Sequence, residues 1–80
     1  MDSSEEKIRT ADELEFAVFC IESIAERLKM NAAQVYEKLA NETVILNSYI
    51  IPEYEILHTQ GKQYIVDDII GLMRERGVKI

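Results

Sequence analysis

The first residue whose chemistry has to be considered is His58, the chain's only histidine, in the segment YEILHTQG (54–61). Glu55 and His58 form a Glu-x-x-His pattern, which on a helix places a carboxylate and an imidazole on one face, as carboxylate-bridged two-metal sites require. Such a site needs two of these motifs, so the chain could build it only as a symmetric dimer with His58 near the two-fold axis. A dimeric metal or ligand site is therefore one alternative for function.

The same segment also has a structural interpretation, which we favour over a catalytic one. Helix ends leave backbone groups without partners, and the imidazole of His58 and the hydroxyl of Thr59 are predicted to bond to such groups where two helices meet. Gly61 would allow a tight turn there. The candidate structural or interaction corner comprises Tyr54, Glu55, His58, Thr59, Gln60 and Gly61.

The remaining reactive residues give little sign of catalysis. Cys20 lies inside the apolar run FAVFCI, where a thiol is normally an inert small hydrophobe, and a Cys20–His58 nucleophile pair would need a third, orienting group. Asp67 and Asp68 are adjacent, so on a helix they point about 100° apart and cannot share an ion unaided. The sequence has no Gly-rich phosphate loop, no CxxC and no His-x-x-x-His. We predict no enzyme and no cofactor.

Length and composition favour a single helical domain. The chain has 80 residues, 48% of them hydrophobic and 30% charged, with one Pro and three Gly. A chain this short has surface for only one core. A lone cysteine, no signal peptide and no apolar run of about 18 residues favour the cytoplasm and argue against a membrane span.

The net charge of −6 argues against a nucleic-acid partner. An acidic chain repels phosphate backbones, so binding would need a local basic patch. The only candidates are Arg74, Arg76 and Lys79, and cations there are explained more simply as complements to a helix dipole. Residues 1–9 are expected to form a flexible acidic leader to a domain spanning 10–80.

The first predicted helix spans about 10–29. Thr10 followed by Glu13 is a capping-box signature. The expected core-facing stripe recurs at three- and four-residue intervals and consists of Leu14, Ala17, Val18, Ile21, Ile24, Ala25 and Leu28. Because FAVFCI is apolar nearly all round, we expect this helix to be central and covered on two sides.

A second helix is predicted over 32–40, capped by Asn31 with Gln34 reaching back. Its inward residues are expected to be Val35, Tyr36 and Leu39, and Asn41 is expected to be left-handed. With the first helix it forms a helix-turn-helix-like corner, so a DNA-binding module is a second alternative. Its outward face offers only one cation, Lys38, which argues against that function.

The rest of the chain completes an all-α fold. The apolar run 43–51 is expected to be a short helix or turn, because a lone strand would have no partner. Pro52 would begin a short helix over 53–58, and a last helix would run over 62–76 to Gly77. Its stripe comprises Tyr64, Ile65, Ile69, Leu72 and Met73, widened by Val66 and Ile70. We expect a compact single-domain bundle of four to five helices.

Four segments resemble a family of short bacterial proteins of unknown function: FAVFCIESIAERL, VYEKL, YIIPEYEILHTQG and YIVDDIIGLMRERGV. The resemblance covers about Glu15 to Val78. It is strongest around the corner, where Tyr54, Leu57, His58, Thr59 and Gly61 match. Members are often encoded beside larger proteins that resemble ADP-ribosyltransferase-type toxins, which implies a partner, adaptor or antitoxin-like role. The resemblance implies no catalytic residue.

The function that we predict is binding to another protein, encoded by the adjacent gene if the resemblance holds. The acidic N-terminal segment and the flank 53–55 would complement a basic partner and speed encounter. Candidate apolar anchors are Tyr36, Tyr49, Tyr54, Tyr64, Ile50 and Ile51, unless they fill the core. A homodimer is left open, because small helical proteins often gain burial by self-association.

Overall fold

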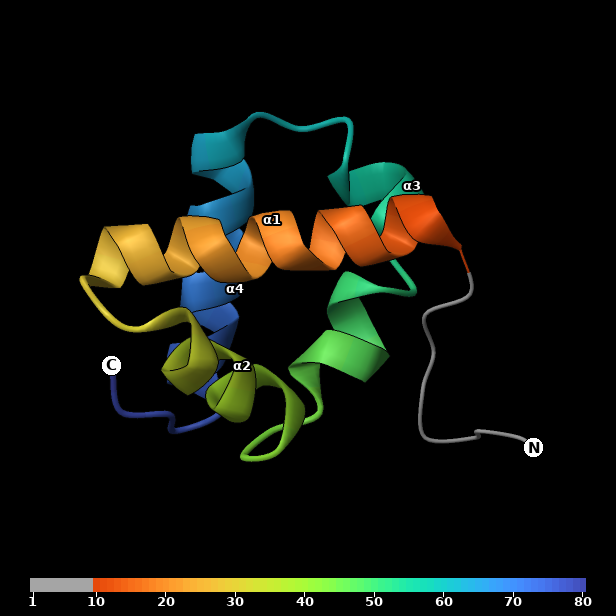
Figure 1. Cartoon of the computed structure of the whole chain (residues 1–80). Helices are drawn as coiled ribbons and strands as arrows, with labels where there is room; N and C mark the ends of the chain where they lie inside the picture. Colours follow the sequence, from red (N-terminus) through yellow and green to blue (C-terminus); the bar gives the residue numbers. More distant parts are fainter. Residues whose placement is uncertain (1–9) are drawn as a thin grey trace.

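The computed structural model describes residues 10–80, which form helices joined by turns and contain no strand. The helices are α1 (Ala11–Leu28), α2 (Ala32–Ala40), the π-helix η1 (Leu46–Ile50), α3 (Tyr54–Leu57) and α4 (Lys62–Glu75). In Figure 1, α1 crosses the molecule, with α4 behind it, α2 and η1 below it and α3 near its N-terminal end. The predicted all-α fold is confirmed. The predicted acidic leader, 1–9, lies outside the described residues.

The predicted helix starts are confirmed in atomic detail. Thr10 Oγ1 accepts a hydrogen bond from the Glu13 N–H at 3.1 Å and so begins α1. The side chain of Asn31 accepts from the Ala33 N–H at 2.7 Å, and Gln34 Oε1 accepts from the Asn31 N–H at 3.1 Å. These bonds satisfy amide groups that a helix start leaves unpaired. The sequence therefore fixes where both helices begin.

The turn between α1 and α2 is made by Lys29 in the left-handed region, with φ of 57°. The N–H of Met30 donates to the Ala25 carbonyl at 2.9 Å and closes the end of α1. The chain then enters α2 at a sharp angle and forms the helix-turn-helix-like corner. The prediction that Asn41 adopts the left-handed conformation is wrong, because its φ is −110°. The Thr43 hydroxyl instead satisfies the end of α2 by donating to the Lys38 carbonyl at 2.9 Å.

The apolar run 43–51 is helical, as predicted, and most of it takes the form of η1. Ile45, Leu46, Ile50 and Ile51 are all buried. A run that is apolar on nearly every side must be covered on nearly every side, and η1 fills the space beneath the N-terminal half of α1 (Figure 1). Ile50 and Ile51 therefore belong to the core and cannot serve as surface anchors.

The core-facing side of α1 differs from the predicted stripe. Its apolar core residues are Phe16, Ala17, Cys20, Ile24 and Ala25. Leu14 and Val18, which were predicted to be buried, have 50% and 42% of their surface exposed. Periodicity was insufficient because FAVFCI offers two apolar rows at helical spacing, and packing against α2 and α4 selects only one. The second row is left partly at the surface.

Two tyrosines that were predicted to face inward are also exposed. Tyr36 on α2 and Tyr64 on α4 have exposed fractions of 42% and 56%. The core positions of these helices are taken by Val35 and Leu39, and by Ile65 and Ile69. At the surface, each phenol hydroxyl keeps its hydration without needing a protein partner. None of the helices within 10–80 is long and apolar enough to cross a membrane.

Candidate functional site

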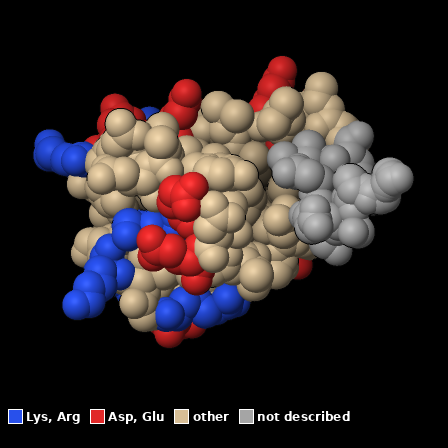
Figure 2. All heavy atoms as spheres, turned by 60° about the horizontal axis from the view of Figure 1, so that its bottom comes forward, with Lys and Arg blue, Asp and Glu red and all other residues tan. Residues whose placement is uncertain are grey.

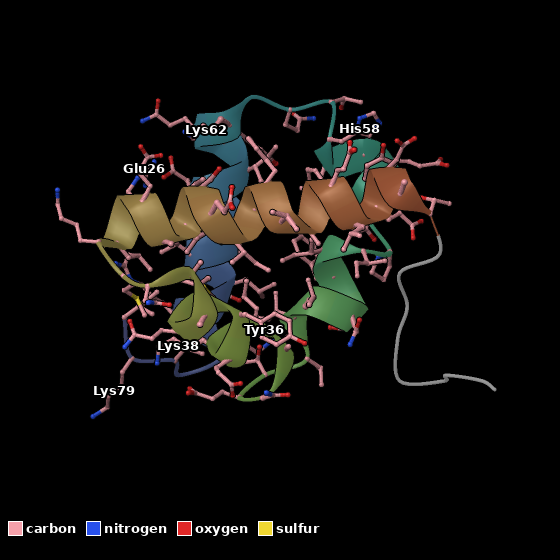
Figure 3. All side chains as sticks on the ribbon, in the orientation of Figure 1. Glu26, Tyr36, Lys38, His58, Lys62 and Lys79 are labelled. Atoms are coloured by element: carbon pink, nitrogen blue, oxygen red, sulfur yellow. The ribbon has the colours of Figure 1, made fainter. Side chains whose placement is uncertain are left out.

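The predicted corner is organised around Tyr54, at the start of α3. Its ring lies edge-on to Phe16 of α1, with centroids 5.4 Å apart. On its other side it stacks on the imidazole of His58 at 4.5 Å and an interplanar angle of 11°. Figure 3 places His58 at the outer side of α3, where it is exposed. Tyr54 thus joins α3 to α1, and His58 covers the tyrosine ring.

Only part of the predicted capping arrangement is present. The Thr59 hydroxyl donates to the Ile56 carbonyl at 2.7 Å, and the Gln60 N–H donates to the Leu57 carbonyl at 2.9 Å. The imidazole of His58 makes no hydrogen bond to any part of the chain from residue 10 onward; its contact is the stack on Tyr54. The prediction for Thr59 is confirmed, whereas that for the imidazole is wrong, because the ring is exposed and stacks on Tyr54.

Gly61 precedes α4 with φ of −71° and ψ of 159°. Most residues adopt this extended conformation, so the turn does not require glycine there. Glu55 and Gln60 are exposed beside it. Of the six residues of the predicted corner, Tyr54 and His58 stack on each other and Thr59 bonds within the turn, while the other three are exposed.

The thiol and the imidazole are held in different environments. Cys20 has no exposed surface, and burial raises the pKa of its thiol from 9.0 to about 12. His58 is exposed. A fully buried protonated thiol and a surface imidazole do not share a solvent-reachable cleft. Across residues 10–80, no three or more His, Cys, Asp or Glu side chains lie close enough together to hold a metal ion. A site shared by two subunits stays a prediction.

An acidic hollow of about 300 Å³ lies between α3 and the start of α1. Its lining residues are Glu13, Ile51, Pro52, Glu53, Tyr54, Glu55 and Ile56. Partial burial, followed by the nearby carboxylates of Asp12, Glu13, Glu15 and Glu55, raises the pKa of Tyr54. This end of the molecule therefore has a negative potential.

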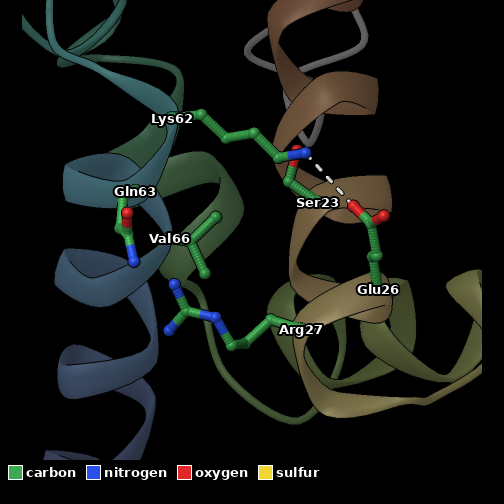
Figure 4. A pocket seen from close by; sticks show the side chains of 6 residues that line it. All are labelled: Ser23, Glu26, Arg27, Lys62, Gln63 and Val66. Carbon is green, nitrogen blue, oxygen red and sulfur yellow. Dashed lines mark hydrogen bonds and ion pairs between the residues drawn. The ribbon is translucent and has the colours of Figure 1, made fainter.

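A second hollow, of about 320 Å³, separates α1 from α4 (Figure 4). It is lined by Ser23, Glu26, Arg27, Lys62, Gln63 and Val66. Lys62 Nζ lies 3.1 Å from Glu26 Oε1, and Arg27 Nη1 lies 2.6 Å from Asp67 Oδ1. Each cation thus already has a carboxylate partner on the facing helix. The two ion pairs connect α1 to α4.

We expect the Arg27–Asp67 pair to contribute little to stability. Its side chains are 38% and 61% exposed, and exposed pairs of this kind contribute about 0.2–1 kcal/mol. A double-mutant cycle with Arg27→Gln and Asp67→Asn, measured by urea unfolding, should give a coupling in that range. Molar salt should abolish it. A coupling of about 2 kcal/mol that persists in salt would contradict this expectation.

The adjacent aspartates act separately, as their spacing predicted. Asp67 faces solvent and pairs with Arg27, whereas Asp68 accepts a hydrogen bond from the Tyr49 hydroxyl. This hydrogen bond, with burial second, raises the pKa of Tyr49 to about 12. A hollow of about 480 Å³ lies beside them, between η1 and α4. The hydroxyl of Tyr49 therefore bonds within the protein, to Asp68 on α4.

The most distinctive surface is one that the sequence interpretation had placed in the core. Leu14 and Val18 are one helical turn apart on α1 and exposed. Glu15 and Glu22 are exposed on the same helix. Between Ala11 and Glu26, α1 carries five carboxylates and no basic residue. This absence of basic residues is the feature of the sequence that could have pointed to an exposed acidic surface on α1. We call Leu14, Val18, Glu15 and Glu22 the α1 surface.

The charge distribution sets this region apart. Figure 2, viewed from the side that is the bottom of Figure 1, shows an uncharged area between acidic side chains along the upper edge and mixed charges at lower left. In Figure 3, Tyr36 lies below the middle of α1. Uncharged surface bordered by acidic side chains therefore lies on this side of the molecule.

A family model described as "Protein of unknown function (DUF3791)" matches residues 15–76, which include all of the predicted corner and most of α1. No curated protein and no solved structure matches the chain.

Proposed function

This chain belongs to the DUF3791 family of proteins of unknown function, and we propose that it is a binding module that acts by forming a complex with another protein. The observation that carries the proposal is the exposure of Leu14 and Val18, at 50% and 42%, on a helix that packs the core with its other side. Single exposed apolar residues are ordinary. Two on adjacent turns of one helix form the kind of patch that marks protein interfaces.

The carboxylates of α1 indicate which charge the partner's surface carries. Charged groups at the rim of an interface steer encounter and exclude partners of like charge. Glu15 and Glu55 present negative charge near the N-terminal end of α1, with half-buried Glu53 beside α3, and Glu22 adds an exposed carboxylate farther along α1. The partner in this proposal therefore offers a basic surface.

The resemblance to short bacterial proteins encoded beside ADP-ribosyltransferase-type toxins indicates the first partner to test. In this proposal the chain is a cytoplasmic companion, antitoxin-like in role, of the protein encoded by the adjacent gene. It acts by occupying a surface and performs no chemistry of its own. Buried Cys20 and surface His58 agree with a role without catalysis.

Binding to DNA through α2 has less support. The outward face of α2 carries Ala32, Ala33, Gln34 and Glu37, with Lys38 as its only cation. Lys38 Nζ lies 3.7 Å from Glu42 Oε2, and its side chain is only 19% exposed. A helix with these residues neither neutralises several phosphates nor reads base edges.

The test is a comparison of three tagged proteins in the native host. The first is the wild type, the second carries Leu14→Ser and Val18→Ser, and the third carries Val44→Ser as the control. Val44 is 61% exposed in the turn between α2 and η1, so it matches the apolar character and exposure of the tested residues at a distance from α1. We expect both variants to remain folded, since exposed positions contribute little to stability. Circular dichroism checks this.

The proposal expects a protein captured by the wild type and by Val44→Ser, and depleted at least tenfold with the double variant. Co-expression with the adjacent gene product alone then identifies whether that product is the partner. Equal capture by all three proteins, or no stable complex with any of them, would contradict the proposed function.

A further inference from the structure

The apolar row that includes Leu14 and Val18 continues along α1 into the core. Leu14, Val18, Ile21 and Ala25 follow one another at spacings of four, three and four residues, which places them on one side of the helix. Ala25 is 7% exposed and Ile21 is half-buried, whereas Val18 and Leu14 are exposed. The same row is therefore covered at its C-terminal end and uncovered at its N-terminal end.

The position of α2 explains this difference. α2 packs against α1 but has nine residues against the eighteen of α1. Since α2 follows directly after the turn at Lys29, it lies below the C-terminal half of α1 (Figure 1) and covers only that part of the row. The surface beyond it is where a further helix would continue the packing that α2 begins.

The charges beside this surface specify what such a helix must carry. Glu15 and Glu22 lie next to Leu14 and Val18 on the outer side of α1, and no basic residue of α1 precedes Arg27. A second copy of the chain, placed there about a two-fold axis, would bring the same carboxylates together. Like charges opposed across an interface are unfavourable. A helix with lysine or arginine at its flanks would pair with them instead.

We propose that the α1 surface receives a basic amphipathic helix from the partner protein. This deepens the proposed function and rests on it. The apolar side of the bound helix packs on Leu14 and Val18 and extends toward Tyr36, which Figure 3 places below the middle of α1. Its lysine or arginine side chains lie over Glu15 and Glu22. The occupant is thus defined by apolar residues at three- and four-residue spacing, flanked by cations.

The test uses a synthetic 18-residue peptide with leucines at helical a and d positions and lysines on both flanks. One control peptide has the same composition in scrambled order, and a second has glutamate in place of each lysine. Binding is measured by fluorescence anisotropy at low and high salt, and its location by chemical-shift changes of backbone amides. The protein variants are Leu14→Ser with Val18→Ser, Glu15→Lys with Glu22→Lys, and Val44→Ser as control.

We expect the basic amphipathic peptide to bind at least tenfold more tightly than the scrambled peptide, with shifts concentrated in 11–22 and at Tyr36. Each double variant should weaken binding at least tenfold, and Val44→Ser should not. The charge-reversed variant should gain affinity for the glutamate peptide. Equal binding of the scrambled peptide, or shifts confined to α4, would overturn the inference.

Two further outcomes separate this inference from the proposed function. If the wild type sediments as a dimer that Leu14→Ser with Val18→Ser dissociates, the surface is occupied by a second copy and the inference fails. If the host protein is captured in a Leu14- and Val18-dependent way but contacts the surface through an acidic or non-helical segment, the proposed function stands and only this inference fails.

Discussion

Replacement of Leu39 by alanine is expected to lower the free energy of unfolding by about 2–5 kcal/mol, whereas the same replacement at Leu14 should change it by less than about 0.5 kcal/mol. Leu39 has no exposed surface, and Leu14 is 50% exposed. Both are leucines within helices, so replacement by alanine changes the helix propensity equally at the two positions. The difference arises because truncation at Leu39 removes buried methyl groups and leaves a cavity in the core.

Urea unfolding of both variants, followed by circular dichroism, measures this difference. A domain of this size has only about 5 kcal/mol or slightly more to lose, so Leu39→Ala could be largely unfolded without denaturant. In that case Leu39→Met serves as the volume-conserving control, with an expected loss below about 1.5 kcal/mol. If Leu14→Ala were as damaging as Leu39→Ala, α1 would turn its other row toward the core, and the α1 surface would not exist.

The thiol of Cys20 is expected to react with a disulfide reagent at pH 8 at least about a thousandfold more slowly in the native protein than in urea. Burial raises its pKa from 9.0 to about 12, which lowers the thiolate fraction by roughly the same factor. Because the Cys20 side chain has no exposed surface, the reagent also cannot reach the thiol in the native state. The reaction should then proceed through unfolding, so its rate should rise with denaturant.

The same shift predicts how stability depends on alkali. Above pH 9 the unfolded chain loses the Cys20 proton and the native state keeps it until about pH 12, so unfolding releases a proton and becomes easier as pH rises. The slope should approach about 1.4 kcal/mol per pH unit. In Cys20→Ala this contribution should vanish, leaving that of Tyr49, whose pKa also rises to about 12. A fast native thiol reaction, or an unchanged slope in Cys20→Ala, would show that the thiol is accessible.

Local signals in the sequence predicted the helices with little error. Thr10 and Asn31 mark helix starts because their side chains bond to amides only two or three residues away. Gly77 marks the end of α4 because φ of 81° strains any other residue. The burial of Cys20 was also predictable, since a thiol within a run that is apolar all round is rarely left in water.

The candidate site was less predictable. The corner residues were identified by type, and the Thr59 hydroxyl bond to the Ile56 carbonyl followed from sequence proximity. The stack of His58 on Tyr54 is also local, because it joins residues four apart on one helical turn. The packing of Tyr54 on Phe16, by contrast, depends on where α3 lies against α1, which no local pattern specifies. The α1 surface was missed because Leu14 and Val18 fit a core stripe as well as Phe16, Cys20 and Ile24 do.

The sequence by itself determined what depends on neighbours in the chain: the all-α class, the helix starts and the acidic character of α1. Only the tertiary structure decided which apolar row of α1 is buried, because that choice depends on how far α2 reaches along it and on where η1 and α4 pack. Helical periodicity shows which side of a helix is apolar. Whether that side is exposed to water depends on the position of the helices that pack against it.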